Sequence, residues 1–257
     1  SYKTFLWNIS EKTINDSAFE DLNHIIHLAG AGIADKRWSE KRKKEIIASR
    51  VASTNLLYNS VKRLKTPLNS FISASATGYY GAITSETIFE EKDKPAKDFL
   101  GKVCSLWEDS IFQFNEIKIR TVALRTGIVL SKDGGALKKM KTPIITSLGN
   151  GKQYMPWIHI DDLCELYIKA IEDQEFKGAF NAVSSEHISN LSFSKKISKI
   201  FNYPFLALGA PSLILQIVFG EMSTIILNGS RISANKIKQA GFKFKFENLE
   251  KALKNLR

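Results

Sequence analysis

The sequence predicts an α/β protein built around a parallel sheet with helices on both faces, and two observations lead to this expectation. Short apolar runs, such as residues 24–29, 71–75 and 121–125, are bounded by polar or glycine-containing breaks, which is typical of strands buried on both faces. Between these runs lie longer segments whose apolar residues recur at helical spacing. Strands and helices therefore alternate along the chain, and this alternation predicts βαβ units.

The predicted helices lie at residues 39–63, 102–114 and 161–172, and further short strands are expected at 128–130 and 179–183. After about residue 190 the pattern changes. A helix at 193–201, a proline-flanked apolar segment at 204–219 and a basic tail ending in a helix at 249–256 predict a smaller lobe that closes over the sheet.

This organisation predicts two parts. We expect residues 1–130 and 158–185 to form the sheet domain, and residues 131–157 and 186–257 to form a lobe that binds the substrate.

Composition narrows the class of protein. A chain of 257 residues with 44% apolar residues can bury a substantial core. The longest apolar candidate, residues 213–219, is too short to span a bilayer, and no signal segment opens the chain. Cys104 and Cys164 lie far apart without metal-ligand spacing. These features predict a reduced, cytoplasmic compartment, no membrane partner and no metal site.

The formal charge of +11 raises the question of nucleic-acid binding. The positive residues are mostly scattered lysines, with a dense patch at 41–44 and a looser one at 138–141, and aromatic residues are not interleaved with them. The pattern therefore favours solvated helix faces and no nucleic-acid partner. Attraction of an anionic, phosphate-bearing ligand is the alternative explanation.

Small or hydroxyl-bearing residues follow several predicted strands. The run His24-Ile-Ile-His-Leu-Ala-Gly30 ends in small residues, so its backbone can approach a flat ligand at the carboxyl edge of a parallel sheet. The run Phe71-Ile-Ser-Ala-Ser-Ala-Thr-Gly-Tyr-Tyr-Gly81 places hydroxyls just past a strand. Two more such runs are Leu124-Arg-Thr-Gly-Ile-Val-Leu130 and Trp157-Ile-His-Ile-Asp-Asp162.

In order and spacing these four runs resemble the extended short-chain dehydrogenases. More narrowly, the chain resembles a subfamily of sugar-nucleotide-epimerase-like proteins with a distinctive C-terminal segment. That narrower likeness rests on Gly32-Ile-Ala-Asp-Lys-Arg-Trp38, Ser49-Arg50, Ser75-Ala-Thr-Gly-Tyr-Tyr-Gly81, Trp157-Ile-His-Ile-Asp-Asp162, Gly220-Glu-Met222 and Ala240-Gly-Phe242. The resemblance covers essentially the whole chain and implies a Rossmann-like doubly wound sheet and a small-molecule substrate.

One expected part is absent from the sequence. Members of this family open with a strand and a Gly-x-x-Gly-x-x-Gly turn, which holds the cofactor pyrophosphate at a helix N-terminus. No glycine precedes Gly30, and residues 2–7 resemble the third strand region. We therefore expect the first βαβ unit, about forty residues, to be missing upstream. Truncation, proteolysis, disorder without cofactor and a true loss of cofactor binding are the alternatives.

The resemblance implies NADP binding, with NAD as the alternative. Residues near the cofactor would be Ala29, Gly30, Glu45, Arg50, Thr126, Gly127 and Ile128. Without the resemblance, Glu45 and Arg50 would be interpreted equally well as a solvated pair on one helix.

The catalytic groups match the family in part. Short-chain dehydrogenases use a strand-end serine and a Tyr-x-x-x-Lys pair, and Ser75 matches the serine. One alignment places Leu100 and Cys104 at the tyrosine and lysine positions, whereas a shift of two residues places Asp98 and Lys102 there. The usual base is missing in either register.

Tyr79 and Tyr80 are the nearest substitute acids, and a structural role for a buried tyrosine hydroxyl is the equal alternative. His159 is a second candidate base, although a network at the start of the following helix is the favoured interpretation. Cys104 is a weaker candidate nucleophile. Because the run Gly149-Asn-Gly-Lys-Gln-Tyr154 lacks Walker spacing, a P-loop is excluded. Through the resemblance, Lys152, Gln153 and His159 are candidate substrate-binding residues.

These observations predict an NAD(P)-dependent oxidoreductase or epimerase-like protein acting on a nucleotide-sugar-like or other anionic small molecule. The alternative is a catalytically degenerate NADP(H)-binding sensor or regulatory protein, which the missing Tyr-x-x-x-Lys pair motivates. The sequence does not determine the oligomeric state, and a homodimer is compatible with it.

Overall fold

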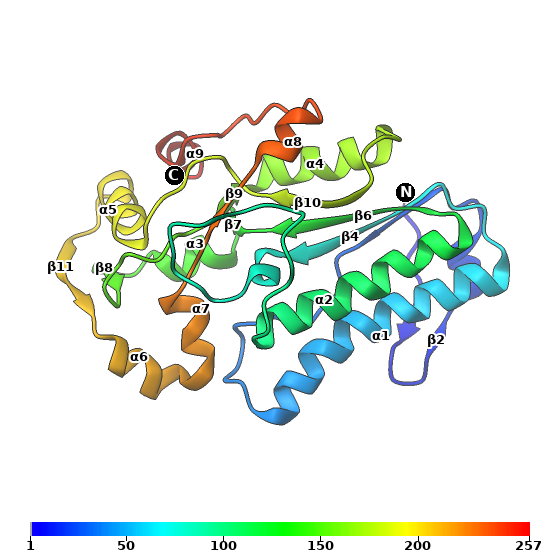
Figure 1. Cartoon of the computed structure of the whole chain (residues 1–257), viewed down its shortest axis with the longest axis horizontal. Coiled ribbons are helices and arrows are strands. Elements are labelled where there is room, and N and C mark those ends of the chain that lie inside the picture. The colour runs from blue at the N-terminus through cyan, green and yellow to red at the C-terminus, as the bar shows by residue number, and fades with distance from the viewer. Residues whose placement is uncertain (1) are drawn as a thin grey trace.

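The computed structural model describes residues 2–257 and contains a four-stranded parallel sheet (Figure 1). Its strands are β3 (His24–His27), β4 (Ser70–Ala76), β6 (Arg120–Thr126) and β10 (Gly178–Ala182), in the spatial order β10-β6-β4-β3. Each neighbouring pair is parallel. The carboxyl ends of β4 and β6 therefore meet at one edge of the sheet, and the predicted parallel architecture is confirmed.

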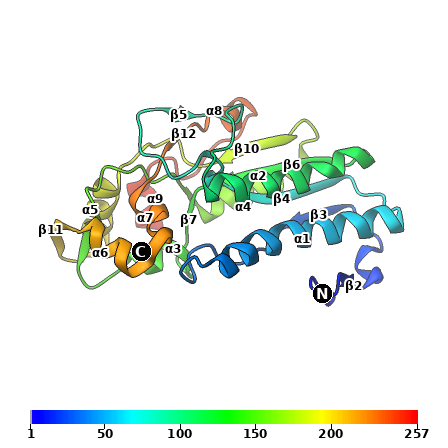
Figure 2. The same cartoon turned by 60° about the horizontal axis from the view of Figure 1, so that its bottom comes forward.

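Helices cover both faces of this sheet. Figure 1 shows α1 (Glu40–Leu64) and α2 (Phe99–Phe112) on one face and α4 (Ile160–Glu172) on the other. The alternation of side chains along β4 explains the two layers, because Phe71 packs among apolar residues of α1 and α2 whereas Ile72 packs against α4. Figure 2 shows α1 and α2 extending along the strands of the sheet, and the two helices contact each other. The sheet is doubly wound, as predicted.

A second apolar core lies beyond the carboxyl edge of the sheet. Here β7 (Ile128–Leu130) pairs with β9 (Trp157–His159), and β8 (Ile145–Leu148) pairs with β11 (Phe205–Ala210), both in parallel. The helices α3 (Gly135–Met140), α5 (Asn190–Phe201) and α9 (Leu249–Asn255) pack around them. We call this part the lobe. The predicted domain boundaries themselves stay a prediction.

The remaining elements are short. They are β1 (Trp7–Asn8), β2 (Thr13–Ile14), β5 (Ile88–Phe89), β12 (Arg231–Ile232), α6 (Ser212–Phe219), α7 (Thr224–Leu227), α8 (Asn235–Gln239) and the 3₁₀ turns η1 (Asp16–Phe19), η2 (Thr77–Tyr80), η3 (Gln113–Ile117) and η4 (Gly220–Ser223). Within residues 2–257, the helices are all too short or too polar to cross a membrane.

One expectation from the sequence needs correction. Residues 2–7 resembled a strand of the sheet, but β1 pairs with β2 as a hairpin, and Tyr2 and Leu6 are 95% and 87% exposed. The apolar segment 204–219, which was expected to be part of the lobe, forms β11, which pairs with β8, and α6, which buries none of its side chains.

Capping side chains define where the helices begin. Ser39 accepts a hydrogen bond from the N–H of Arg42 at the start of α1. Asp98 caps α2 by accepting from the N–H of Gly101 (2.8 Å), and its other oxygen accepts from the N–H of Ala82 (2.8 Å). Asp98 therefore joins the start of α2 to the segment that follows η2.

Gly101, in the first turn of α2, lies against the backbone of the segment that leads into this helix. A Cβ atom at this position would come 2.1 Å from the carbonyl oxygen of Ala96. We expect Gly101→Ala to destabilise the protein by about 1–3 kcal/mol, because backbone must move, even though alanine favours a helix by roughly 1 kcal/mol. Urea unfolding measures the difference. Gly134→Ala is the matched control, since a Cβ there meets nothing within 4 Å. Equal stability of the two variants would contradict the close contact.

His27 ends β3 in a buried site between two serines. Its ring nitrogens lie 3.0 Å from Ser53 Oγ and 3.2 Å from Ser73 Oγ, and burial lowers the pKa of His27 from 6.5 to about 4. A histidine whose folded pKa is lowered contributes stability that is complete above its unfolded pKa and is lost as the pH falls toward the folded pKa.

We therefore expect the free energy of unfolding to fall by about 3 kcal/mol through His27 as the pH drops from 7 to 4. Chemical unfolding at several pH values measures this slope. His27→Gln should flatten it, and an unchanged slope in that variant would assign the pH dependence to other groups.

Candidate functional site

A cavity of about 430 Å³ opens at the carboxyl ends of β4 and β6. Residues 76–78 line it after β4, and residues 126–128 line it between β6 and β7. Residues from α1 and α2 and residues 154–156 and 228–230 of the lobe complete the walls. In doubly wound sheets this edge is where ligands bind, so the cavity is the candidate functional site.

The walls of the cavity are largely apolar. Its apolar side chains are Ile33, Ala34, Ala76, Ala82, Leu100, Val103, Cys104, Trp107, Ile128, Ala136, Met155, Pro156, Ile225 and Ile232. Arg50 is the one charged residue among the described lining residues. Uncharged polar side chains come from Thr77, Thr126, Tyr154, Asn228 and Ser230.

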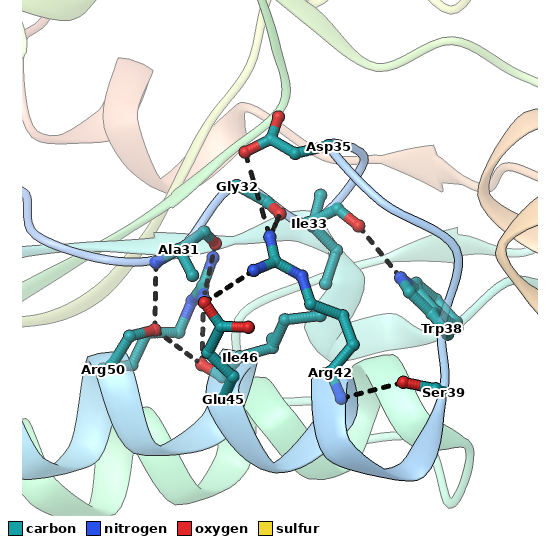
Figure 3. A network of polar contacts seen from close by, with 11 residues as sticks. Ala31, Gly32, Ile33, Asp35, Trp38, Ser39, Arg42, Glu45, Ile46 and Arg50 are labelled. Carbon is teal, nitrogen blue, oxygen red and sulfur yellow. Dashed lines mark hydrogen bonds and ion pairs between the residues drawn. The ribbon is translucent and has the colours of Figure 1, made fainter.

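Arg50 reaches the cavity from α1. Its Nη1 donates to the carbonyl oxygens of Ala31 and Ile46, both at 3.0 Å, and its guanidinium lies 4.9 Å from the ring centroid of Trp107. Figure 3 shows Arg50 below the backbone of Ala31. Burial lowers the pKa of Arg50, which still remains charged at neutral pH. The indole N–H of Trp107 is buried and has no hydrogen-bond partner within residues 2–257.

A second arginine, Arg42 of α1, connects this helix to the segment after Gly30. Arg42 is buried, and its Nη2 donates to the carbonyl oxygen of Gly32 (2.5 Å) while its Nη1 pairs with Glu45 (2.8 Å) (Figure 3). The hydrogen bond from Arg42 lowers the pKa of Glu45. Glu45 is exposed and does not line the cavity. Ala29 and Gly30 are also outside the described lining, although Gly30 lies beside the Arg50 side chain. The sequence offered no signal for Arg42 beyond its place in a basic run.

Ser75 belongs to a buried cluster behind the cavity wall. Its hydroxyl donates to Glu108 Oε1 (2.7 Å), and Glu108 forms a bidentate pair with Arg125, with both contacts at 2.8 Å. Glu108 and Arg125 are each 3% exposed. Ser75 is absent from the described cavity lining, so a catalytic role for it stays a prediction.

The two predicted catalytic tyrosines belong to the same cluster. The Tyr80 hydroxyl donates to Asn181 Oδ1 (2.6 Å) and accepts from Arg125 Nη1 (2.9 Å), while the Arg125 guanidinium lies 3.4 Å from the Tyr79 ring centroid. Burial raises the pKa of both tyrosines. Neither is part of the described lining. The geometry therefore matches the structural alternative for Tyr80, whose hydroxyl is fully partnered.

In the first of the two registers, Leu100 and Cys104 would take the positions of the Tyr-x-x-x-Lys pair. Both line the cavity, and a Cβ at Gly78 would lie 3.5 Å from atoms of each. In the shifted register Asp98 is a helix cap and Lys102 is exposed. Burial raises the pKa of the Cys104 thiol to about 12, so at neutral pH it is neither a thiolate nor a nucleophile.

Thr77 is the hydroxyl that the sequence reasoning missed. It follows β4 directly and lines the cavity, and its Oγ1 lies 3.5 Å from the carbonyl oxygen of Thr126, at the limit of a hydrogen bond. Alternation along β4 places Ser75 on the face that α2 covers. Because β4 ends at Ala76, the side chain of Thr77 does not have to point to the same face of the sheet as Ser75. The signal that could have identified Thr77 was therefore its position directly after the last residue of β4.

The three predicted substrate-binding residues lie outside the described lining. Lys152 is exposed, and Gln153 is buried with its Nε2 donating to the carbonyl oxygens of Leu148 (3.0 Å) and Ile226 (2.9 Å). His159 caps α4, where its Nδ1 accepts from the N–H of Asp161 (3.1 Å). Burial lowers the pKa of His159. The favoured interpretation of His159 as part of a helix-start network agrees with this geometry.

Comparison with family descriptions gives two matches. Residues 4–101 match the "NAD dependent epimerase/dehydratase family", and residues 210–256 match a "Domain of unknown function (DUF1731)". An "Epimerase family protein" of Staphylococcus aureus (strain NCTC 8325) is 34% identical over 241 residues, which cover 92% of this chain and 80% of that protein. A protein of the same description from Staphylococcus saprophyticus is 34% identical and covers 94% of this chain and 82% of its own length.

Solved structures resemble the whole fold. The human epimerase family protein SDR39U1 (isoform 2) with NADPH has a TM-score of 0.84 and 26% identity, and the match covers 94% of this chain and 85% of the human one. A nucleoside-diphosphate sugar epimerase from Corynebacterium glutamicum has a TM-score of 0.76 and 26% identity, covering 96% of this chain and 48% of its own. UDP-glucose 4-epimerase of Thermotoga maritima, with UDP-glucose, has a TM-score of 0.75 and 19% identity, covering 96% and 79%. The last likeness concerns the fold alone.

The buried pair of Glu108 and Arg125 generates a stability prediction. We expect Glu108→Ala to lower the free energy of unfolding by about 3–5 kcal/mol, because it leaves the Arg125 charge buried without its partner. Urea unfolding measures the loss. Lys254→Ala is the control, since it removes an exposed pair with Glu250 (2.7 Å) and should change stability by less than about 1 kcal/mol. A loss at Glu108 no larger than in the control would refute the structural role of the pair.

Proposed function

The chain belongs to the NAD-dependent epimerase/dehydratase family, and we propose that it is an oxidoreductase that uses NADPH to transfer a hydride in the cavity at the carboxyl edge of its sheet. The observation that carries this proposal is the cavity itself. The strand ends at residues 76–78 and 126–128 line one space of about 430 Å³, at the position where doubly wound sheets bind dinucleotides. The human relative crystallised with NADPH, at 26% identity, favours NADPH over NADH.

The residues present fit a nicotinamide dinucleotide. Gly30 has no side chain beside the half-buried Arg50, so a flat ligand can approach the backbone there. Apart from Nη1, the Arg50 guanidinium makes no hydrogen bond within the described part of the chain, so its Nε and Nη2 groups can donate to ribose or phosphate oxygens. Ala29 and residues 126–128 would complete the contacts. When bound, the nicotinamide supplies or accepts the hydride.

The other lining residues position the substrate and exclude water. Thr77 would donate a hydrogen bond from its loosely held hydroxyl to a substrate oxygen. Leu100, Cys104 and Trp107 make the α2 wall apolar, and such a wall strengthens the electrostatic interactions inside the cavity. Because the Cys104 thiol stays protonated, it takes no part in proton exchange near neutral pH.

A second candidate function is an NADP(H)-binding sensor without turnover. The observation in its favour is the replacement of the usual tyrosine and lysine by Leu100 and Cys104 in the cavity wall. Cofactor binding is common to both candidates, and only turnover separates them.

We expect Arg50→Leu to weaken NADPH binding by about tenfold to a hundredfold, which corresponds to the loss of hydrogen bonds from a charged donor. NADPH fluorescence titration measures the Kd of protein expressed from its whole gene. Arg63→Leu is the matched control, because Arg63 pairs with Asp16 on the exposed part of α1. An unchanged Kd in Arg50→Leu would remove Arg50 from the site. Failure of the natural protein to bind NADPH would overturn the proposed function.

A further inference from the structure

We infer that the substrate reduced by NADPH is a small uncharged molecule whose hydride-accepting carbon is conjugated to a carbonyl group, and that it is not a nucleoside diphosphate sugar. This inference rests on the proposed function and specifies the substrate class of the same cavity. It follows from the charge, the hydrogen bonding and the size of the cavity.

The lobe side of the cavity provides no charge for a diphosphate. Proteins hold diphosphates with arginine, lysine or the N–H groups at a helix N-terminus. The lobe side of the described lining is formed by Ala136, Tyr154, Met155, Pro156, Ile225, Asn228, Gly229, Ser230 and Ile232. Arg50, the charged lining residue, comes from α1 and contacts Trp107 of α2, at the place proposed for the cofactor.

Two cations near the lobe side, Arg231 and Lys43, are already paired. Arg231 follows Ser230 in the chain, yet its Nη2 pairs with Glu86 (2.7 Å) and donates to the Tyr154 hydroxyl (2.7 Å). Lys43, at the contact between α1 and η4, pairs with Glu221 at 2.6 Å. A diphosphate would have to break one of these pairs to gain a counter-charge from Arg231 or Lys43.

Most polar side chains of the cavity are also committed to internal hydrogen bonds. Ser230 donates to the carbonyl oxygen of Ile83 (2.6 Å), and Thr126 donates to that of Leu124 (3.0 Å). The Tyr154 hydroxyl donates to Glu86 (3.1 Å), and the Asn228 amide donates to the carbonyl oxygen of Thr224 (3.3 Å). Thr77, with its contact at 3.5 Å, is left to bind a substrate oxygen.

The chemistry of the walls restricts the reaction. Interconversion of an alcohol and a ketone moves a proton at the substrate oxygen together with the hydride, which requires an acid or base there. Leu100 and Cys104, which take the positions of such a group in the first register, line the cavity, and burial raises the pKa of Cys104 so that it holds its proton. A threonine hydroxyl can donate a hydrogen bond but is too weak an acid to supply the proton.

A conjugated carbonyl compound avoids this requirement. With NADPH bound, the β-carbon would receive the hydride in a new C–H bond, and the π electrons of the carbon–carbon double bond would move toward the carbonyl oxygen to give an enolate. Thr77 stabilises the negative oxygen by a hydrogen bond. Water then protonates the α-carbon. NADPH is oxidised to NADP⁺, and the double bond is reduced by one hydride and one proton.

The size of the cavity agrees with a small substrate. Its volume of about 430 Å³ must hold the reacting end of the cofactor as well as the substrate. Small-molecule sites range from about 300 to 1,000 Å³, so this shared volume is near the lower limit.

The test uses protein expressed from its whole gene, saturated with NADPH, and follows NADPH absorbance with cyclohexenone or cinnamaldehyde as the acceptor. UDP-glucose is tested in parallel for binding, by calorimetry, and for epimerisation. We expect protein-dependent reduction of the conjugated carbonyls and no binding of UDP-glucose. Thr77→Val should lower kcat/KM by about a hundredfold with the Kd for NADPH unchanged. Thr13→Val, an exposed change of the same shape on β2, should leave both values unchanged.

The outcomes separate the two proposals. If NADPH does not bind, the proposed function fails and the inference fails with it. If NADPH binds but neither carbonyl compound is consumed, the cofactor site stands, the inference is overturned and the sensor function is favoured. Binding or epimerisation of UDP-glucose would also overturn the inference. Reduction that is insensitive to Thr77→Val would remove the assigned role of Thr77.

Discussion

The buried pair of Arg125 and Glu108 is the interaction on which the architecture of the site depends. Arg125 lies at the end of β6, Glu108 lies on α2, and hydrogen bonds extend the pair to Ser75 of β4 and to Tyr80 of η2. Charges in a buried site are tolerated only when each is fully partnered, so the strands and the helix must keep their relative positions. Arg125 immediately precedes Thr126, and Glu108 lies one helical turn beyond Cys104. The pair therefore holds two walls of the cavity at their separation.

The distribution of polar groups around this cavity differs from the one that the sequence led us to expect. Ser75 and Tyr80, which the sequence favoured for catalysis, lie with Glu108 and Arg125 behind the wall, whereas most of the side chains that line the cavity are apolar. Tyr80 shows the reason, since its hydroxyl donates its one hydrogen to Asn181 and accepts from Arg125, which leaves no donor for a ligand. Within the cavity, Arg50 and Thr77 keep donors that protein groups do not fully use. Specificity then depends on a few donors in an apolar space.

The fold could be predicted from local patterns, whereas the site depended on contacts between distant segments. Short apolar runs and helical spacing located the sheet and its covering helices because both signals follow from burial. Ser75 and Thr77 are two residues apart, and only the exact end of β4 decides which one reaches the cavity. The partnership of Glu108 with Arg125 joins different elements and has no signature in sequence spacing. The exposure of α6 was equally hidden, since its sequence is apolar but Leu213 and Ile217 are 65% and 67% exposed.

The buried thiol of Cys104 has a protective consequence. Conjugated carbonyl compounds are electrophiles, and thiolates, more than thiols, attack them. Burial raises the pKa of Cys104 to about 12, so about one molecule in a hundred thousand carries the thiolate at neutral pH. A cysteine in this wall can therefore stand beside an alkylating substrate over many turnovers without being modified. The same desolvation that excludes Cys104 from proton transfer would make the protein resistant to inactivation by the conjugated carbonyl compounds proposed as its substrates.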